Sequence, residues 1–459
     1  MENKVTARNP ITEGCIWKGM LLFALPIMLG SLLQQLYNTA DAVIVGRALG
    51  KAALASVGGS SARISNLLVN AFVALSSGAS VIVAQHFGAR DTQRVRRSIC
   101  TAMLLSVVCG ILLTVLGITS ARQLLVWMQT TPETLDASAS YLRIFFLGMV
   151  PTMLYNMGSG ILRAMGDSKR PLYYLFVCVV ANIALDLLFV IVFQWGIEGA
   201  AAATALSQVV CAALVVRALR RLPEEQRLLY DREELDRGIL RRMLHVGIPA
   251  ALQSSMYGIA NIVLQVGINM LGTDSMAGWT AFNKFDDYYW PISNAIGIAV
   301  MTYVGQNFGA KNAERIKLGV RQIFLLVGGL SIFAGALTLI FSEPLVSLYV
   351  KPNETEVIAY SLEFIRIQAW FFPFLGWIWL YNSTVKGMGK INISMVSSVV
   401  ELCSKIGLSL LLPIWIGTTG IWFAAPIGYI LGIIPLLIYY YSGRWKKLLT
   451  VPAAEPAKA

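Results

Sequence analysis

The segment Gln85-His86-Phe87-Gly88-Ala89-Arg90 returns in the second half of the chain as Gln306-Asn307-Phe308-Gly309-Ala310-Lys311. Each copy ends a long apolar stretch and leads into a basic one, with Arg94 and Arg315 at matching positions after it. Membrane units that occur twice in one chain usually place their working site where the two copies meet. The repeat therefore predicts a transporter built from two related halves.

The composition is that of a membrane protein. Of the 459 residues 56% are hydrophobic and only 14% are charged, and the mean hydropathy is +0.64. A soluble domain carries roughly 25% charged residues. Long apolar stretches recur from end to end, which is typical of a polytopic α-helical protein. They are too long and too evenly apolar for the alternating strands of a membrane barrel.

We predict an all-α polytopic membrane protein with about twelve transmembrane helices in two pseudo-symmetric six-helix bundles around a central cavity. The predicted spans are 17–46, 53–87, 98–120, 138–165, 171–194 and 198–217, then 245–272, 276–307, 317–341, 358–388, 392–415 and 420–441. The predicted domains are an N-terminal lobe, 1–217, a cytoplasmic linker, 218–244, a C-terminal lobe, 245–441, and a cytoplasmic tail, 442–459. Stretches longer than the ~20 residues of one crossing predict tilted or bent helices.

The basic residues predict the orientation. The net charge of +12 is concentrated in short segments on alternate connections, at 90–97, 163–170, 311–321 and 444–447. By the positive-inside rule both termini face the cytoplasm. This distribution predicts contact with anionic membrane lipids and argues against a nucleic-acid partner. The polar stretch 217–242 is interpreted as a solvated tether with a surface helix.

Further matches extend the repeat. Leu25-Pro26 corresponds to Ile248-Pro249, and Asn38 corresponds to Asn261. Arg163-Ala164-Met165-Gly166 matches Lys386-Gly387-Met388-Gly389, and Gly196 matches Gly417. Each half has an even number of predicted spans, so the copies should be related by an axis along the membrane normal. A proline removes a helical hydrogen bond, and we therefore expect Pro26 and Pro249 to act as hinges.

Carboxylates inside the predicted spans are candidates for function, because a charge at the bilayer centre is costly. They are Asp41, Asp186, Asp286, Asp287 and Glu401. Tyr37 and Asp41 lie one helical turn apart and share a face, with Gln34 and Asn38 near the same stripe. Such a stripe must face the protein interior. A role in helix packing alone is the alternative interpretation.

A second polar face follows in the fifth and sixth spans. Asn182 and Asp186 lie one turn apart, and Thr204 lies in a small-residue run where helices can approach closely. If the first, fifth and sixth spans converge, these residues and Asp41 form an oxygen-lined pocket. Two carboxylates in a low dielectric cannot both ionise cheaply, so the pair would hold a proton or share a cation such as Na⁺.

The second half does not repeat this pocket. Glu401 and Lys405 lie one turn apart and are expected to pair. Lys284, Asp286 and Asp287 precede Tyr288-Tyr289-Trp290, where they could bind a cationic substrate against aromatic faces or form a salt-bridged cluster at the outer interface. We count these residues as candidates for the substrate cavity, together with Asn261 and, from the first half, Gln34 and Asn38.

No enzyme, cofactor or metal site other than one for Na⁺ is predicted. The scattered cysteines form no metal-binding pattern, and a GxxxxGK[ST] loop for ATP is absent from the sequence. An intramembrane aspartyl protease could use two aspartates, but its GxGD signature is missing. A flippase for a lipid-linked substrate is the main alternative, although it should line its cavity with more basic residues than Arg63, Lys284, Lys405, Arg143 and Arg366.

The chain resembles the multidrug and toxic compound extrusion (MATE) family, and more closely its DinF-like branch. The resemblance spans nearly the whole chain and is carried by the repeated Gln-x-Phe-Gly-Ala motif, Pro26, Asn156 and Asn182-x-x-x-Asp186. It implies an antiporter, driven by H⁺ or Na⁺, that exports amphipathic, often cationic drugs or toxic metabolites. It further implies a coupling-cation site at Tyr37, Asp41, Asn182, Asp186 and Thr204, with Asn156 nearby.

One departure from the family favours coupling through the first half. The NorM-like branch carries acidic residues in the seventh and tenth spans. Here Tyr257 stands near the first of these positions, and the tenth span has no carboxylate between Phe371 and Asn382. The sequence does not indicate which ion couples; we expect a monomer.

Overall fold

The computed structural model describes residues 11–229, 231–269, 273–347, 354–417 and 419–450. Within these ranges the side chains of 232, 259, 261–290, 345 and 450 lie outside the description. Every regular element in the described ranges is helical. The predicted all-α class is therefore confirmed.

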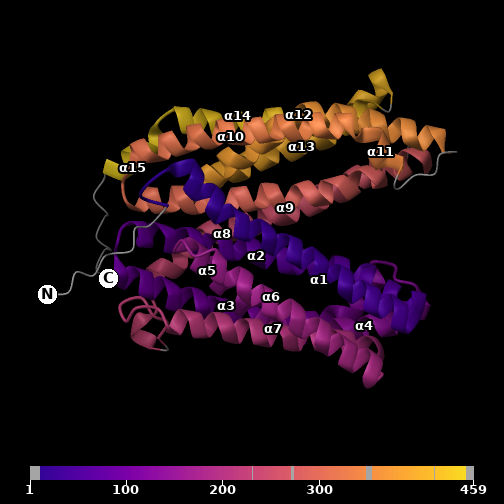
Figure 1. Ribbon diagram of the computed structural model, residues 1–459, viewed down its shortest axis with the longest axis horizontal. Coiled ribbons are helices and arrows are strands. Elements are labelled where there is room, and N and C mark those ends of the chain that lie inside the picture. Colours follow the sequence, from indigo (N-terminus) through magenta and orange to yellow (C-terminus); the bar gives the residue numbers. More distant parts are fainter. Residues whose placement is uncertain (1–10, 230, 270–272, 348–353, 418, 451–459) are drawn as a thin grey trace. The chain divides into compact units, whose positions relative to one another are not determined.

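The first half contains the helices α1 to α7 (Figure 1). Their bounds are α1 Ile16–Gly58, α2 Ser60–Gly88, α3 Thr92–Trp127, α4 Pro132–Leu147, α5 Met149–Ala164, α6 Lys169–Asp186, the π-helix η1 Leu187–Val192 and α7 Gly196–Arg220. The 3₁₀ turn η2, Arg232–Glu234, lies in the linker.

The second half contains the remaining helices. Their bounds are α8 Arg237–Asn269, α9 Thr273–Gly309, α10 Ala313–Ile340, α11 Ser342–Ser347, α12 Thr355–Gly387, α13 Ile391–Ile416, α14 Thr419–Tyr441 and α15 Arg444–Thr450. Among the described residues, 8 helices are long and apolar enough to cross a membrane, or 9 if the bent pair α4 and α5 forms one span. The helices α8, α9 and α12 lie where three further spans were predicted and have 33, 37 and 33 residues.

The repeated motif forms the same turn twice. In the first copy, backbone bonds from Ala89 to Gln85 and from Asp91 to His86 close the end of α2, and Arg90 adopts a left-handed φ of 57°. The second copy closes α9 in the same way, with Lys311 at φ 55°. The next residue then caps the following helix: Asp91 accepts from the Arg94 N–H and Asn312 from the Arg315 N–H. The motif is therefore a signal to end one helix and begin the next.

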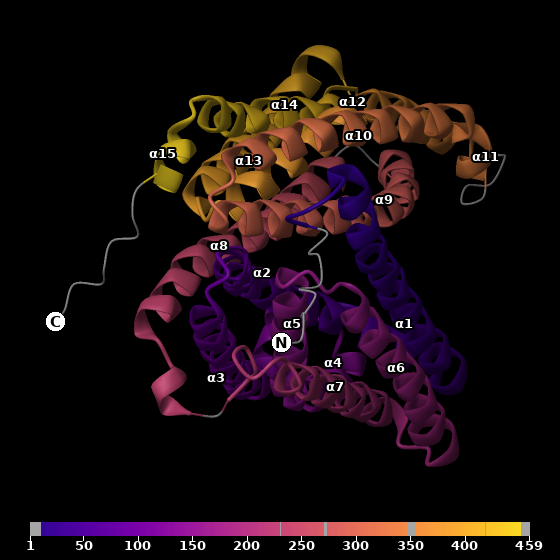
Figure 2. The same cartoon turned by 60° about the vertical axis from the view of Figure 1, so that its left-hand side comes forward.

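The chain divides into two compact units. One comprises Leu25–Leu252, and the other comprises Met1–Ala24 together with Gln253–Ala459. In the first, α5 packs against α2, α3 and α7 (Figures 1 and 2). In the second, α12 packs against α9, α10 and α14, while α13 packs against α14. The helices α1 and α8 each pass from one unit into the other.

The helices α1, α4, α5 and α6 depart from simple straight spans. The helix α1 is interrupted at Gly50, whose φ of 84° only glycine adopts readily. The predicted span 138–165 is bent by 50° between α4 and α5. The predicted span 171–194 changes to a π-helix directly after Asp186. Single π turns of this kind are frequent at functional sites.

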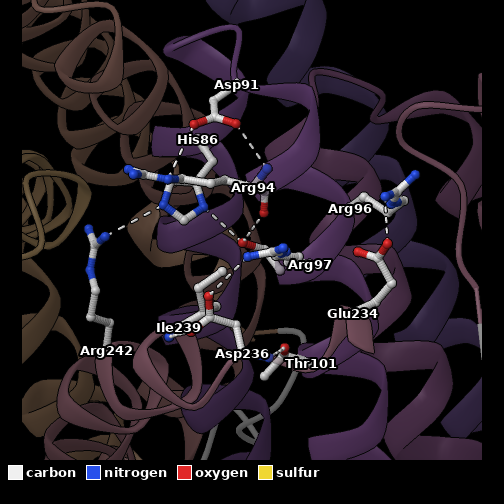
Figure 3. A network of polar contacts seen from close by, with 11 residues as sticks. His86, Asp91, Arg94, Arg96, Arg97, Thr101, Glu234, Asp236, Ile239 and Arg242 are labelled. Carbon is white, nitrogen blue, oxygen red and sulfur yellow. Dashed lines mark hydrogen bonds and ion pairs between the residues drawn. The ribbon is translucent and has the colours of Figure 1, made fainter. Parts of the chain in front are cut away.

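The linker is not the solvated tether that we expected. Leu228 is buried in the core formed by α2, α3 and α5, and the Cys100 thiol donates to the Leu229 carbonyl at 3.3 Å. Figure 3 shows how its last residues bind α3: Arg96 pairs with Glu234 at 2.5 Å, and the Asp236 N–H donates to the Thr101 hydroxyl at 3.2 Å. Basic side chains on α3 thus hold acidic side chains of the linker, because the opposite charges lie side by side.

Candidate functional site

The helix α1 carries the first two candidate residues. Tyr37 is buried and packs against Leu175 and Val179 of α6. Its hydroxyl donates to the Thr204 hydroxyl oxygen of α7 at 3.3 Å. Asp41 follows one turn later, and its Oδ1 atom is buried without a hydrogen-bond partner among the described residues. The predicted convergence of the first and sixth spans is therefore present at Tyr37 and Thr204.

The helix α6 carries the next two candidate residues, Asn182 and Asp186. Asn182 and Asp186 are both 0% exposed. Neither the side-chain amide of Asn182 nor either carboxyl oxygen of Asp186 has a hydrogen-bond partner in the part of the chain that the structure describes. Because α6 ends at Asp186 and continues as the π-helix η1, this carboxyl group lies where the regular backbone hydrogen bonding changes.

The two carboxyl groups belong to one cluster. Asp41 and Asp186 lie close enough for their charges to interact. Both also interact electrostatically with Tyr141 of α4, which is buried. We name Tyr37, Asp41, Tyr141, Asn182, Asp186 and Thr204 the acidic cluster. Sequence reasoning missed Tyr141, because its place in the cluster comes from the packing of helices that are distant in the chain, which spacing does not reveal.

Several polar atoms of the acidic cluster are buried without partners among the described residues. Burying a polar group without a partner costs roughly 1–3 kcal/mol by mutational measures, and an unpaired charge costs more. A proton on one carboxyl group, or a cation shared by several oxygens, would remove this cost. The donor set of two carboxylates, an amide and three hydroxyl groups consists of the hard oxygen ligands that suit such a cation.

Other first-half candidates lie in different surroundings. The Asn156 amide of α5 donates to the Thr152 carbonyl at 2.9 Å. With Ser76 and Ser106 it lines a small cavity that has room for about one water molecule. On α1, Gln34 is half-buried and Asn38 is exposed.

In the second half, the buried carboxylate of Glu401 belongs to a hydrogen-bonded network. The Tyr257 hydroxyl of α8 donates to Glu401 Oε2 at 2.6 Å and lies 3.2 Å from the Ser398 hydroxyl. Lys405 lies close enough to Glu401 for the two charges to interact. Tyr257 was noted in the sequence only as a departure from an acidic position, and its bond to Glu401 was not predicted.

The network extends across three helices. Gln253 of α8 donates to the Ser394 and Ser398 hydroxyl groups of α13, and the Ser394 hydroxyl donates to Asn382 of α12 at 2.8 Å. We name Gln253, Tyr257, Asn382, Ser394, Ser398 and Glu401 the second-half network. The side chains of the predicted cavity residues Asn261, Lys284, Asp286 and Asp287 lie outside the described residues. Both predicted hinge residues, Pro26 and Pro249, lie inside helices, α1 and α8.

Two homologous sets of apolar helices, each with a buried carboxyl group, define a polytopic membrane transporter. The MatE family model matches residues 26–188 and, a second time, residues 249–411. The chain belongs to the MatE family, the multidrug efflux transporters, and each half supplies one MatE repeat.

Relatives of this chain span almost its full length. It is 29% identical to the probable multidrug resistance protein YoeA of Bacillus subtilis over 96% of this chain and 98% of that protein. It is 24% identical to the probable multidrug resistance protein NorM of Thermotoga maritima over 94% of each. A crystal structure of MATE in the bent conformation matches with a TM-score of 0.90 and 22% identity, covering 98% of this chain and 100% of that one. The last comparison shows the fold.

Proposed function

We propose that this chain is an antiporter that exports amphipathic, often cationic organic molecules and takes up H⁺ or Na⁺ at the acidic cluster. The observation that carries the proposal is a set of buried oxygens on Asp41, Asn182 and Asp186 that have no hydrogen-bond partner among the described residues. A second-half coupling site has less support, because Glu401 already accepts a hydrogen bond from Tyr257. This assignment agrees with the first-half coupling that the DinF-like branch implies.

In the proposed mechanism the cation and the substrate favour opposite conformations. A cation at Asp41 and Asp186 would draw α1 toward α6, while Tyr37 links α1 to Thr204 on α7. A ligand shifts a conformational equilibrium only through its different affinity for the two states. Uptake of the cation then drives release of the substrate, and the two affinities are linked reciprocally.

The remaining parts of the proposal follow from sequence and family. Both termini face the cytoplasm of a bacterial plasma (inner) membrane, and the protein works as a monomer surrounded by lipid. The substrates are drugs or toxic metabolites of small size. Aromatic and methionine side chains supply an adaptable wall, which suits a broad range of compounds.

The test is efflux of a fluorescent cationic dye from cells that carry single substitutions. We expect Asp41→Asn to abolish energised efflux, because the amide cannot hold an exchangeable proton or balance a cation. Asp136→Asn is the matched control: this exposed carboxylate pairs with Arg122 at 3.4 Å. Efflux at the wild-type rate in Asp41→Asn cells would end the proposed coupling role.

The coupling ion is identified in vesicles. Dye movement is measured under an imposed proton gradient and then under an imposed sodium gradient of the same size. An antiporter responds to one of them and loses that response in Asp41→Asn. Dye movement that follows neither gradient would contradict cation coupling.

A further inference from the structure

Each copy of the repeated motif binds a chain segment that leads into another helix. In the second copy, the Arg315 guanidinium donates to the carbonyl groups of Ile11 and Gly14 at 3.4 and 3.1 Å. Asn307 donates to the same Ile11 carbonyl at 3.5 Å and to Tyr303 at 2.8 Å. Ile11 is buried, and Gly14 makes a turn with φ 83° just before α1 begins. This copy therefore anchors the start of α1.

The first copy anchors the start of α8 with the roles reversed. Here the guanidinium belongs to the incoming helix: Arg242 of α8 donates from Nη2 to Gln85 Oε1 at 3.4 Å. Its Nη1 lies 3.5 Å from His86 Nε2 (Figure 3). Since arginine only donates, His86 Nε2 accepts, and its Nδ1–H faces the Ser98 hydroxyl at 2.8 Å. The Ser98 hydroxyl in turn donates to the Arg94 carbonyl. The chain of bonds fixes one tautomer of the ring.

Backbone packing fixes the same part of α8. A Cβ atom added at Gly78 of α2 would lie 2.5 Å from the Gly247 nitrogen, so the two helices touch through their backbones. Met243 and Ile239 belong to the core formed with α2, α3 and α5. Asp236 caps the helix by accepting from the Ile239 N–H at 3.0 Å. The first turns of α8 are thus a structural part of the unit Leu25–Leu252.

Both anchored helices, α1 and α8, cross the boundary between the two compact units close to a proline. The boundary on α1 falls between Ala24 and Leu25, next to Pro26. The boundary on α8 falls between Leu252 and Gln253, less than one turn after Pro249. Any motion of one unit against the other must deform these two helices. A proline removes a backbone hydrogen bond, so a helix bends most easily at that position. The bend is confined to the proline only when the end of the helix is held in place.

We propose that Arg242 and Arg315 are positioning residues of the transport cycle, which hold the ends of α8 and α1 on the two copies of the repeated motif. The inference rests on the proposed function, since it concerns the rate of the conformational change that transport requires. With the ends held, bending is confined to the neighbourhood of the prolines. Without an anchor, the end of the helix separates from its unit, and part of the motion no longer reaches the substrate and cation sites.

The structural half of the test is hydrogen exchange of the purified protein, followed by mass spectrometry. In Arg242→Gln we expect amide exchange in residues 237–248 to accelerate by roughly fivefold, which corresponds to the loss of one hydrogen bond of about 1 kcal/mol. In Arg315→Gln the same acceleration is expected at residues 11–20. Each variant should leave the segment anchored by the other arginine unchanged. Arg241→Gln and Arg321→Gln are matched controls, because these arginines lie on the same helices, α8 and α10.

The functional half separates the maximal rate of dye efflux from the dye concentration at half-saturation. We expect the maximal rate to fall roughly fivefold in each variant with little change in half-saturation, because the anchors act on motion and touch no proposed binding residue. Arg242→Lys and Arg315→Lys should restore about half of the rate, since an ammonium group still donates but lacks the fork of the guanidinium.

The outcomes distinguish the two proposals. Unchanged exchange at both segments would show that the arginines anchor nothing. Accelerated exchange with an unchanged maximal rate would show a structural role alone and would also overturn the inference. A change confined to half-saturation would place the arginines in substrate binding instead. A wild-type protein that exports no dye under either gradient would end the proposed function, while the exchange measurements would still decide whether the anchors exist.

Discussion

The acidic cluster and the second-half network are built on corresponding parts of the two repeats, and they treat buried polar groups in opposite ways. In the first half, oxygens of Asp41, Asn182 and Asp186 are buried without partners among the described residues. In the second half, Glu401 accepts from Tyr257, and Ser394 donates to Asn382. The same fold therefore contains one unsatisfied and one largely satisfied set of polar groups.

The difference indicates a division of labour between the repeats. A satisfied buried network makes packing specific and rigid. An unsatisfied set is costly in the folded chain unless a ligand completes it, so it gains more from binding a proton or a cation. We infer that the first repeat kept the exchangeable site, while the second uses its carboxylate to hold α8 against α13.

The largest expected effect comes from exchanging one acid in each set for its amide. We expect Asp186→Asn to lower energised dye efflux by roughly 100-fold, since the site then loses the charge that a proton or cation must neutralise. The equivalent change, Glu401→Gln, should lower it by no more than about threefold, because the amide can still accept from Tyr257. Initial efflux rates measured at equal protein levels check the pair.

Thermal unfolding of the same two variants serves as the control. Their losses of melting temperature should rank in the opposite order to their losses of efflux. Asp186→Asn should leave the melting temperature unchanged or raise it, because it removes an unpaired buried carboxyl group. If instead Glu401→Gln abolished efflux and Asp186→Asn did not, the division of labour would be reversed. Equal losses in both variants would mean that the two repeats share the coupling role.

The fold could be predicted largely from the sequence, because apolar length and repeated turns are local signals. The pairs Arg90 and Lys311, and Gly166 and Gly389, were found as sequence matches, and all four prove to be left-handed turn residues. The bend between α4 and α5 could not be found in this way. Its apolar length is continuous, and the local signal that was passed over is Pro151, because a proline removes a helical hydrogen bond. At the bend Gly148 lies against Ala205 of α7, where an added Cβ would lie 3.0 Å away.

The candidate site was only partly accessible from the sequence. Spacing placed Tyr37 with Asp41, and Asn182 with Asp186, because a helical turn is a local relation. Tyr141 and the bond from Tyr257 to Glu401 depend on contacts between distant helices, which no spacing reveals. The linker was misjudged for a related reason: its acidic residues suggested solvation, whereas Arg96 of α3 binds Glu234.

The second prediction concerns the stability of the network. Tyr257→Phe should lower the free energy of unfolding by about 1–3 kcal/mol, because it leaves the buried Glu401 Oε2 without its donor. Tyr37→Phe removes only the 3.3 Å bond to Thr204 and should cost less than about 1 kcal/mol. Thermal unfolding of both variants in the same detergent checks the order. A larger loss for Tyr37→Phe would show that the first-half hydroxyl groups also stabilise the fold.

A smaller effect is expected at the edge of the acidic cluster. Thr204→Val keeps the shape of the side chain and removes one oxygen, so the cation concentration for half-maximal efflux should rise roughly threefold, as for a weak hydrogen bond. The maximal rate should stay the same, since neither carboxyl group changes. Ser207→Ala, one turn later on α7, is the matched control, because its hydroxyl donates to the Thr204 carbonyl at 2.8 Å. A drop in maximal rate for Thr204→Val would give Thr204 a role in motion.

The smallest expected effect concerns one hydroxyl–carboxylate hydrogen bond in each half. The two halves place the hydroxyl group and the carboxylate on opposite members of the helix pair. The Ser140 hydroxyl of α4 donates to Glu198 of α7 at 2.5 Å, and the Thr419 hydroxyl of α14 donates to Glu363 of α12 at 2.5 Å. Both pairs join corresponding helices, although the carboxylate sits on the later helix in the first half and on the earlier one in the second. Because the pairs are partly hydrated, Ser140→Ala and Thr419→Val should each lower the free energy of unfolding by less than about 1 kcal/mol and leave efflux unchanged. A loss of efflux from one variant alone would mean that the division of labour between the repeats extends beyond their buried acids.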